Sequence, residues 1–225
     1  MALFPMFVDL SGRYCLVLGA GAVALRKIHT LLAAGARVHV WSKEVCEDIV
    51  CLAGEGKVIL EDGNISPKSL IPKAFLVICA TSDPDFNERM LCLCRQCHIF
   101  VNCATENRDA KENGSGGPLM ESGYDTSFIF PSLIVRDTIS VGISTFPPAP
   151  SLSRYIRQRL DACIPGWYGR LGRSLYKYRK RLRKFNLTQP GRARIMERLT
   201  EYGLSHEGNI PGEIFLKYLN EERKL

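Results

Sequence analysis

Residues 14–42, which read YCLVLGAGAVALRKIHTLLAAGARVHVWS, decide the fold class. The stretch begins with a short apolar run at residues 14–18, as expected for a strand that is buried on both faces of a parallel sheet. A glycine-rich turn follows, and apolar side chains then recur at helical spacing as far as Gly35, which is placed to end a helix. A second apolar run lies at residues 38–41. The order strand, glycine turn, helix and strand predicts a βαβ unit.

The glycine turn fits the dinucleotide-binding pattern G-x-G-x-x-[G/A] in the setting that the pattern requires, after a strand and at the start of a helix. The first glycine permits the tight turn, the second lets the backbone approach a pyrophosphate, and the small third residue lets helix and strand pack closely. The helix N-terminus adds unpaired N–H groups for the phosphates. We therefore expect dinucleotide binding, rather than a purely structural turn, at Gly19, Gly21, Ala22, Val23 and Ala24.

The end of the second strand bears on the choice of dinucleotide. NAD-selective sites usually carry an acidic residue about 20 residues after the glycines. Here Glu44 offers a carboxylate to the ribose hydroxyls of NAD, whereas Lys43 would suit the 2′-phosphate of NADP. The sequence favours NAD and leaves NADP open. Thr81 and Asn87 follow another buried strand, and we expect them beside the cofactor because ligands bind at the carboxyl ends of such strands.

The alternation of strands and helices continues to residue 104 and predicts a doubly wound parallel sheet with right-handed crossovers. Ser42 is placed to cap the helix after the second strand, and Ser82 or Asp83 can cap the helix that starts near Pro84. If so, the segment around Thr81 has a structural role instead of a cofactor role. The three further strands are expected at residues 57–61, 74–80 and 98–104.

The pattern changes after the fifth strand. Residues 106–126 are polar and glycine-rich and predict a long loop, and residues 127–145 hold two strand-like runs that predict a hairpin. Ser151 is placed to cap the first of several helices. We therefore divide the chain into a Rossmann-type domain at residues 1–112, a loop and hairpin dimerisation region at 113–149, and a small helical, basic domain at 150–225.

Composition limits the function classes. The chain has 225 residues, of which 46% are hydrophobic and 24% charged, as in ordinary globular proteins. No run approaches the roughly 18 apolar residues of a membrane span, and the start shows no signal-peptide pattern, so we expect a cytoplasmic protein. The formal net charge of +7, with Lys and Arg crowded into residues 154–194, indicates a polyanionic partner or a solvated helix face. No nucleic-acid-binding motif is present, so nucleic acid is not expected.

Residues 91–100, LCLCRQCHIF, contain the string C-x-x-C-H, which is typical of haem attachment. On the predicted helix Cys94 and Cys97 lie three residues apart and share a face, which we expect to pack against the sheet, whereas Cys92 points elsewhere. Covalent haem attachment also needs an exported chain. We therefore predict reduced packing thiols and no metal site. A surface thiol or His98 site that holds iron remains the alternative.

Five stretches of the chain occur together in an order typical of one family: LFPMFVDLSGRYCLVLGAGAVALRKIHTLLAAGARVHV, ATSDPDFNERM, VN, SFIFPSLIVRDTISVGIST and PAPSLSRYIRQRL. Over about residues 3–165 the sequence thereby resembles precorrin-2 dehydrogenases. The resemblance implies an N-terminal Rossmann domain, an intertwined homodimer, and NAD-dependent oxidation of precorrin-2 to sirohydrochlorin on the route to siroheme. Some members also act as ferrochelatases. The "VN" pair implies that Asn102 belongs to the cofactor site.

The substrate that the resemblance implies accounts for the basic second half of the chain. Precorrin-2 carries many carboxylates, and the planar guanidinium of arginine presents paired donors to a carboxylate. Arg154 and Arg157 lie in the first helix after the hairpin, so they are candidates for substrate contact. Arg159 lies near them.

Two departures from the family concern the reaction. The family carries an Asp shortly after "VN", proposed to act in proton transfer and metal insertion; Thr105 stands here instead, and a hydroxyl cannot act as a base near neutral pH. We assign the catalytic role to Asp125, with Glu106 and Asp109 as alternatives. Bulky or rigid residues at 146–148 replace glycines of a family turn, which puts ferrochelatase activity in question. A non-catalytic module that senses dinucleotides is the second hypothesis.

Overall fold

A computed structural model describes residues 4–103, 126–145 and 149–224. The chain forms two compact units, Met1–Phe130 and Pro131–Leu225, and each is described by itself. The expected boundary at 112/113 lies outside the described residues, so the three-part division stays a prediction.

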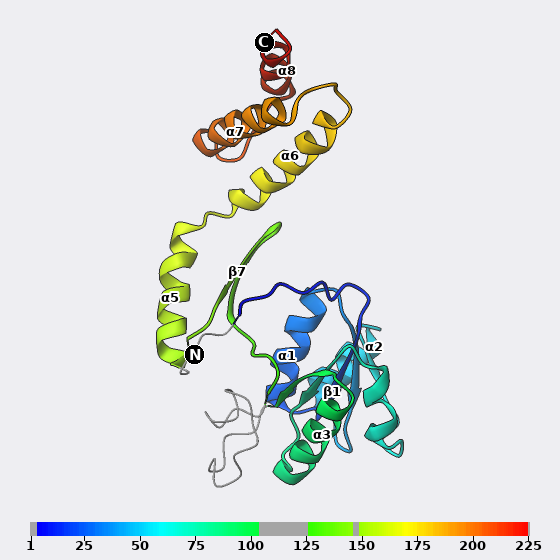
Figure 1. The fold of residues 1–225 in the computed structure, drawn as a ribbon. Helices are drawn as coiled ribbons and strands as arrows, with labels where there is room; N and C mark the ends of the chain where they lie inside the picture. Colours follow the sequence, from blue (N-terminus) through cyan, green and yellow to red (C-terminus); the bar gives the residue numbers. More distant parts are fainter. Residues whose placement is uncertain (1–3, 104–125, 146–148, 225) are drawn as a thin grey trace. The chain divides into compact units, whose positions relative to one another are not determined.

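The first unit is a five-stranded parallel sheet with helices packed on it (Figure 1). The strand order is β3-β2-β1-β4-β5, so the chain moves outward in one direction from β1 and then in the other direction from β4. This confirms the predicted doubly wound sheet. Its elements are β1 (Tyr14–Leu18), α1 (Ala22–Ala33), β2 (Arg37–Trp41), α2 (Glu47–Gly54), β3 (Val58–Leu60), two 3₁₀ turns (Pro67–Ser69 and Ile71–Lys73), β4 (Leu76–Cys79), α3 (Pro84–Gln96) and β5 (Phe100–Cys103).

Both faces of the sheet are covered, which explains why β1 is an uninterrupted apolar run. Cys15 and Val17 face one core cluster, which includes Ile28 of α1, whereas Leu16 and Leu18 face a second cluster. That second cluster contains the side chains of α3 that pack on the sheet. Trp41 belongs to it and stacks on Phe86, with ring centroids 5.5 Å apart.

The helix starts agree with the sequence in one case and differ in two. Asp83 caps α3, and its Oδ1 accepts a hydrogen bond from the Phe86 N–H at 3.0 Å. The prediction that Ser42 caps α2 is wrong, because α2 starts five residues later and the Ser42 hydroxyl donates to the Glu44 carbonyl at 2.6 Å. Ser151 is not a cap either, because it lies inside its helix after Ala149 and Pro150.

The C-x-x-C-H string lies at the end of α3. Cys94 is fully buried in the second core cluster, and burial raises its pKa to about 12. Cys92 is exposed, Cys97 is the C-cap residue, and His98 has a positive φ of 55° just beyond the helix. No group of three or more His, Cys, Asp or Glu side chains among the described residues could hold a metal ion. The string is therefore a helix end whose inward thiol packs on the sheet.

The second unit begins with the predicted hairpin, β6 (Ser132–Arg136) and β7 (Ile139–Ile143), which is antiparallel. An ion pair of 2.7 Å between Arg136 and Asp161 links β6 to the first helix of this unit. The last three helices enclose a separate core in which Tyr178 stacks on Phe215. The helices are α5 (Pro150–Cys163), α6 (Trp167–Leu182), α7 (Gln189–Ser205) and α8 (Gly212–Glu222).

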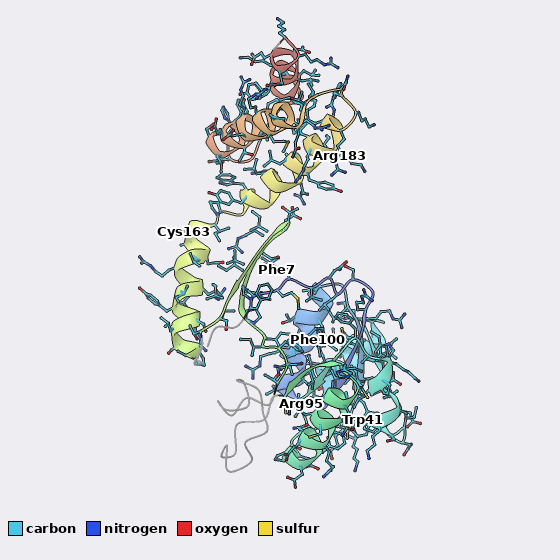
Figure 2. The ribbon with its side chains drawn as sticks, viewed as in Figure 1. Phe7, Trp41, Arg95, Phe100, Cys163 and Arg183 are labelled. Carbon is cyan, nitrogen blue, oxygen red and sulfur yellow. The ribbon has the colours of Figure 1, made fainter. Side chains whose placement is uncertain are left out.

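Two surface properties of the described residues bear on function. Basic side chains around the end of α6, including Arg179, Lys180 and Arg183, are exposed (Figure 2). None of the helices in the parts described is both long and apolar enough to cross a membrane.

Candidate functional site

Gly19 ends β1 at the carboxyl edge of the sheet and is required for two separate reasons. Its φ is +108°, a conformation that side-chain-bearing residues rarely adopt. A Cβ at this position would also lie 2.6 Å from the carbonyl carbon of Ala80 and 2.8 Å from the amide nitrogen of Thr81. The backbone after β1 therefore packs directly on the backbone after β4. In this chain the first glycine serves the close approach of two strand ends as well as the turn.

Gly21 differs from Gly19, because a Cβ added to it would meet no atom of the described residues within 4 Å. Gly21 is the N-cap residue of α1, where no side chain caps the helix and the first turn holds no acidic residue. Gly21, Ala22 and Val23 are exposed. The helix thus presents its N-terminal N–H groups and its positive dipole end to open space, which is what a pyrophosphate requires. These residues fit a dinucleotide.

Ala24 has the role that the motif assigns to its last position. Its side chain is fully buried in the core cluster between α1 and the sheet. A larger side chain here would push the helix away from β1, and the start of α1 would move with it.

The side chain of Asn87 is hydrogen-bonded to Thr81 after β4, and these bonds form the Thr81–Asn87 lock. Asn87 is fully buried, and its Oδ1 accepts from the Thr81 hydroxyl at 2.7 Å and from the Thr81 N–H at 3.2 Å. Its Nδ2 donates to the Thr81 carbonyl at 2.9 Å. All these contacts hold the backbone against which Gly19 packs. The structure therefore gives both residues a direct role in shaping the edge of the sheet, while contact with a cofactor stays a prediction.

Asn102 of β5 is the centre of a second network. Its Nδ2 donates to the Phe128 carbonyl at 2.9 Å and to the Thr126 hydroxyl at 3.2 Å, and its Oδ1 accepts from the Lys27 ammonium. The amide thus joins β5, α1 and the segment that begins at Thr126. Its polar atoms already have partners within the protein, so a direct bond to a cofactor remains an expectation from the family resemblance.

Lys27 was not identified from the sequence. It lies three residues after Ala24 and four before Leu31, both of which are buried, so it occupies the apolar stripe of α1. Burial lowers the pKa of its ammonium from the ordinary value. A lysine at a core position of the predicted helix was the signal that could have found it.

Lys43 and Glu44 lie beyond the end of β2, and both are exposed. The Ser42 hydroxyl donates to the Glu44 carbonyl, and the Cys46 N–H donates to the Ala20 carbonyl at 3.2 Å. These bonds bring the segment close to the glycine turn. Lys43 and Glu44 are thus placed to contact the ribose of a dinucleotide. Their positions do not distinguish NAD from NADP.

The proposed catalytic residue Asp125 and its alternatives Glu106 and Asp109 lie outside the described residues. Thr105, the turn at 146–148 and most of the expected loop at 106–126 lie outside them as well. The proposed substrate contacts are described. Arg154 on α5 is exposed and Arg157 is half-buried. They belong to the second unit and stay predictions.

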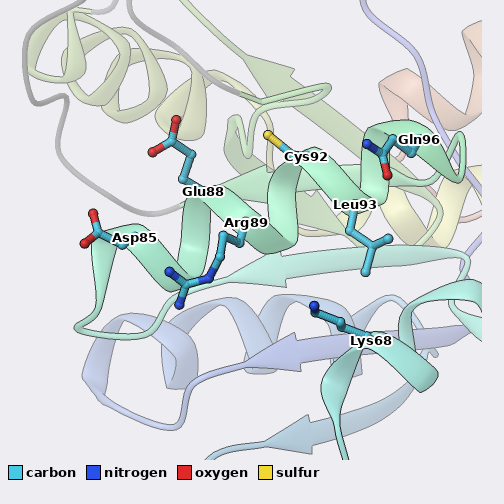
Figure 3. Close-up of a pocket in the computed structure, with 7 residues that line it drawn as sticks. All are labelled: Lys68, Asp85, Glu88, Arg89, Cys92, Leu93 and Gln96. Carbon is cyan, nitrogen blue, oxygen red and sulfur yellow. The ribbon is translucent and has the colours of Figure 1, made fainter.

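A hollow of about 610 Å³ lies along α3 (Figure 3). It contains none of the predicted site residues, and its charged lining combines both signs. We therefore place the dinucleotide site at the glycine turn, where the backbone geometry is specific. The hollow is lined by Lys68, Asp85, Glu88, Arg89, Cys92, Leu93 and Gln96.

Comparison with known proteins agrees with this assignment. Residues 6–113 match a family described as putative NAD(P)-binding. Siroheme synthase of Nitrosococcus oceani is 33% identical over 184 residues, which are 82% of this chain and 36% of that protein. Siroheme synthase of Neisseria meningitidis serogroup B is 38% identical over 165 residues, which are 73% of this chain and 31% of that protein. The chain thus spans about a third of the length of these curated relatives.

A solved structure described as SirC, precorrin-2 dehydrogenase, shares the fold. It covers 99% of this chain and 100% of its own, with a TM-score of 0.65 and 20% sequence identity. The glycine turn belongs to a nicotinamide-dinucleotide-binding domain, and the sequence likeness to siroheme synthases extends beyond that domain. The chain is therefore similar in sequence to one part of the siroheme synthases and has the fold of the SirC structure.

Proposed function

We propose that the chain is a cytoplasmic enzyme that oxidises precorrin-2 to sirohydrochlorin with NAD as the hydride acceptor. The observation that carries the proposal is the open space beside Gly21 at an uncapped helix N-terminus, in a chain 33% identical to a siroheme synthase. The oxidation removes one hydride and one proton from precorrin-2, and bound NAD supplies the hydride-accepting ring.

The protein's part is to bind and orient the two reactants. The N–H groups at the start of α1 would hold the pyrophosphate, and the carboxylate of Glu44 would accept hydrogen bonds from the adenosine ribose. The Thr81–Asn87 lock would keep the edge beneath the dinucleotide in place. Lys43, which would suit the 2′-phosphate of NADP, is adjacent to Glu44. The preference for NAD over NADP is therefore tested by measuring the rates with the two cofactors side by side.

The proton acceptor and the substrate contacts belong to the proposal as well. Asp125 is our candidate for the proton, because Thr105 has no usable basicity near neutral pH. Arg154 and Arg157 are our candidates for the carboxylates of precorrin-2. Arg154 is exposed and Arg157 is half-buried. Guanidinium groups are well suited to bind carboxylates, which supports both candidates.

We also propose a homodimer. The fourteen-residue helix α5 buries none of its residues, although Leu152, Tyr155 and Leu160 are large and apolar. The hairpin exposes Leu133 and Val135 in the same unit. Exposed large apolar side chains on one helix and one hairpin are candidates for a protein–protein interface, and a second copy of the chain is the partner that the family resemblance implies.

The test is incubation of the purified protein with precorrin-2 and NAD under anaerobic conditions, followed by absorption spectra. We expect sirohydrochlorin to form, more slowly with NADP. The Asp125→Ala variant should lose most of the rate, whereas Glu106→Gln and Asp109→Asn should not. A protein that binds NADH but forms no sirohydrochlorin would instead support the non-catalytic sensing module, which the substitution of Thr105 for the family Asp favours.

Ferrochelatase activity is tested in the same preparation by adding ferrous iron after sirohydrochlorin has formed. Iron is a substrate in that reaction. Formation of siroheme faster than in a protein-free control would extend the proposal to metal insertion, and an unchanged rate would restrict it to dehydrogenation.

A further inference from the structure

The half-buried ammonium of Lys27 is a charge that the fold places inside the dinucleotide-binding unit. Its Nζ donates to Asn102 Oδ1 and lies 5.5 Å from the centre of the Phe130 ring. Among the described residues, none of the ion pairs includes Lys27. Within residues 4–103, 126–145 and 149–224, its positive charge is held by an amide oxygen and an aromatic face, and no acid of these residues pairs with it.

In the described part of the chain, two thiols interact electrostatically with Lys27, those of Cys79 at the end of β4 and Cys103 at the end of β5. Burial raises the pKa of Cys79, so this thiol is uncharged near neutral pH. Partial burial of an ammonium has an energetic cost, which its lowered pKa reflects. Such a cost is often connected with function.

The position of the ammonium is fixed by the network around Asn102. The Nδ2 atom of Asn102 donates to the carbonyl of Phe128, so its Oδ1 must face the other way, toward Lys27. Asn102 is 6% exposed and cannot easily turn. The ammonium is thus held at β5, within two residues of the carboxyl end of that strand.

The strand order shows which half of a dinucleotide lies near this charge. The ribose-binding segment with Lys43 and Glu44 follows β2, and the pyrophosphate site is at the start of α1. A dinucleotide that spans the edge in a doubly wound sheet therefore has its adenosine half over β2 and its nicotinamide half over β4 and β5. Lys27 lies on the nicotinamide side.

We propose that Lys27 tunes the site electrostatically, so that it prefers the reduced nicotinamide over the oxidised one. The oxidised ring carries a positive charge and the reduced ring is neutral, so a fixed cation nearby disfavours the oxidised form alone. The bias favours hydride uptake, which is the direction that the oxidation of precorrin-2 needs. This inference rests on the proposed function, because it assumes that the hydride moves from precorrin-2 to NAD.

The experiment measures dissociation constants of NAD and NADH for the purified protein by calorimetry, without substrate. Lys27→Gln keeps a donor for Asn102 and removes the charge, whereas Lys27→Arg keeps the charge. Arg26→Gln removes the neighbouring exposed charge on the same helix and serves as the matched control. We expect Lys27→Gln to lower the preference for NADH by about threefold or more. Lys27→Arg and Arg26→Gln should retain the wild-type preference.

An equal change of both dissociation constants in Lys27→Gln would overturn the proposal and leave Lys27 a structural role. If Lys27→Gln does not fold, the pH dependence of the wild type decides. Because the pKa of Lys27 is lowered from 10.5, the preference for NADH should fall as pH rises toward that value. Lys27→Arg keeps its charge over this range together with both thiols, so its profile shows any contribution of the thiols alone. A wild-type preference that falls no more steeply with pH than that of Lys27→Arg contradicts the proposal.

The result is distinguishable from a failure of the proposed function. Wild-type protein that binds neither nucleotide would overturn both. Protein that binds both nucleotides with the expected Lys27 effect, but does not oxidise precorrin-2, would overturn the proposed substrate and leave the electrostatic role intact.

Discussion

Replacing Gly19 with alanine should destabilise the first unit strongly. The backbone at Gly19 has a φ of +108°, and holding a non-glycine residue in such a region costs about 1–3 kcal/mol. The new Cβ would also lie 2.6 Å from the Ala80 carbonyl carbon, a backbone atom that cannot rotate away. Overpacking of this kind costs about another 1–3 kcal/mol. We therefore expect the free energy of unfolding to fall by about 2–6 kcal/mol, a large part of the 5–15 kcal/mol that is typical of proteins.

Gly21→Ala is the matched control. Its φ is not positive and the new Cβ meets no atom of the described residues within 4 Å, so the free energy of unfolding should fall by less than about 1 kcal/mol. The methyl group would occupy the open space at the start of α1, however, and would displace a pyrophosphate. Loss of one charge-assisted hydrogen bond of about 1.5–3 kcal/mol weakens NADH binding by about tenfold or more.

Urea denaturation followed by circular dichroism measures the first quantity, and calorimetric titration with NADH measures the second. Gly19→Ala should lose stability, and Gly21→Ala should lose affinity while keeping stability. The reasoning is refuted if both variants lose similar stability, or if Gly21→Ala binds NADH as tightly as the wild type.

Three further predictions concern the hydrogen bonds and packing inside each unit. Asn87→Ala removes three hydrogen bonds to Thr81 and should lower the free energy of unfolding, measured in urea, by about 2–3 kcal/mol. Thr81→Val removes only the hydroxyl and should lower it by about 1 kcal/mol. Equal losses in the two variants would contradict the role of Asn87 in holding the Thr81 backbone. The buried hydroxyl of Tyr14 forms no hydrogen bond of good geometry with a described residue, although it interacts with the Glu61 carboxylate, so Tyr14→Phe should be neutral or stabilising by up to about 1 kcal/mol. Burial and the Glu61 carboxylate raise the pKa of Tyr14 from 10.0 to about 12. Between pH 10.0 and about 12 the folded phenol keeps its proton while the unfolded phenol loses it. The free energy of unfolding of the wild type should therefore fall relative to that of Tyr14→Phe over this pH range. Parallel curves of the free energy of unfolding against pH for the two proteins would exclude this. Gly169→Ala places a Cβ 2.6 Å from the Cβ of Asp137 in the hairpin turn and should lower the melting temperature of the protein. An unchanged melting temperature would contradict this and show that the turn can move aside.

The sheet could be predicted from the sequence because its signals are local. The run at residues 14–18 is apolar at every position, as burial on both faces requires, and Asp83 caps α3 through a bond to a residue three positions away. Ser42 shows the limit of such signals, since its hydroxyl bonds a carbonyl within its own loop and α2 starts later.

The candidate site could be predicted only in part, because its support comes from residues distant in sequence. Lys27 and Asn102 are 75 positions apart, and nothing in either segment indicates the other. Asn87 was expected beside a cofactor, and the structure shows its amide bonded to Thr81. The three-residue spacing of Cys94 and Cys97 indicated a shared helix face, and the full burial of Cys94 agrees with it, although Cys97 proves to be the C-cap residue.

The central claim is that this chain transfers a hydride from precorrin-2 to NAD. The measurement that tests it most directly follows NADH and sirohydrochlorin together, by their separate absorption bands, in one anaerobic reaction that contains the purified protein. The account predicts that the two products appear at the same rate and in equal molar amounts, and that Gly21→Ala slows both equally. Sirohydrochlorin that appears without NADH, or NADH binding without either product, would contradict it.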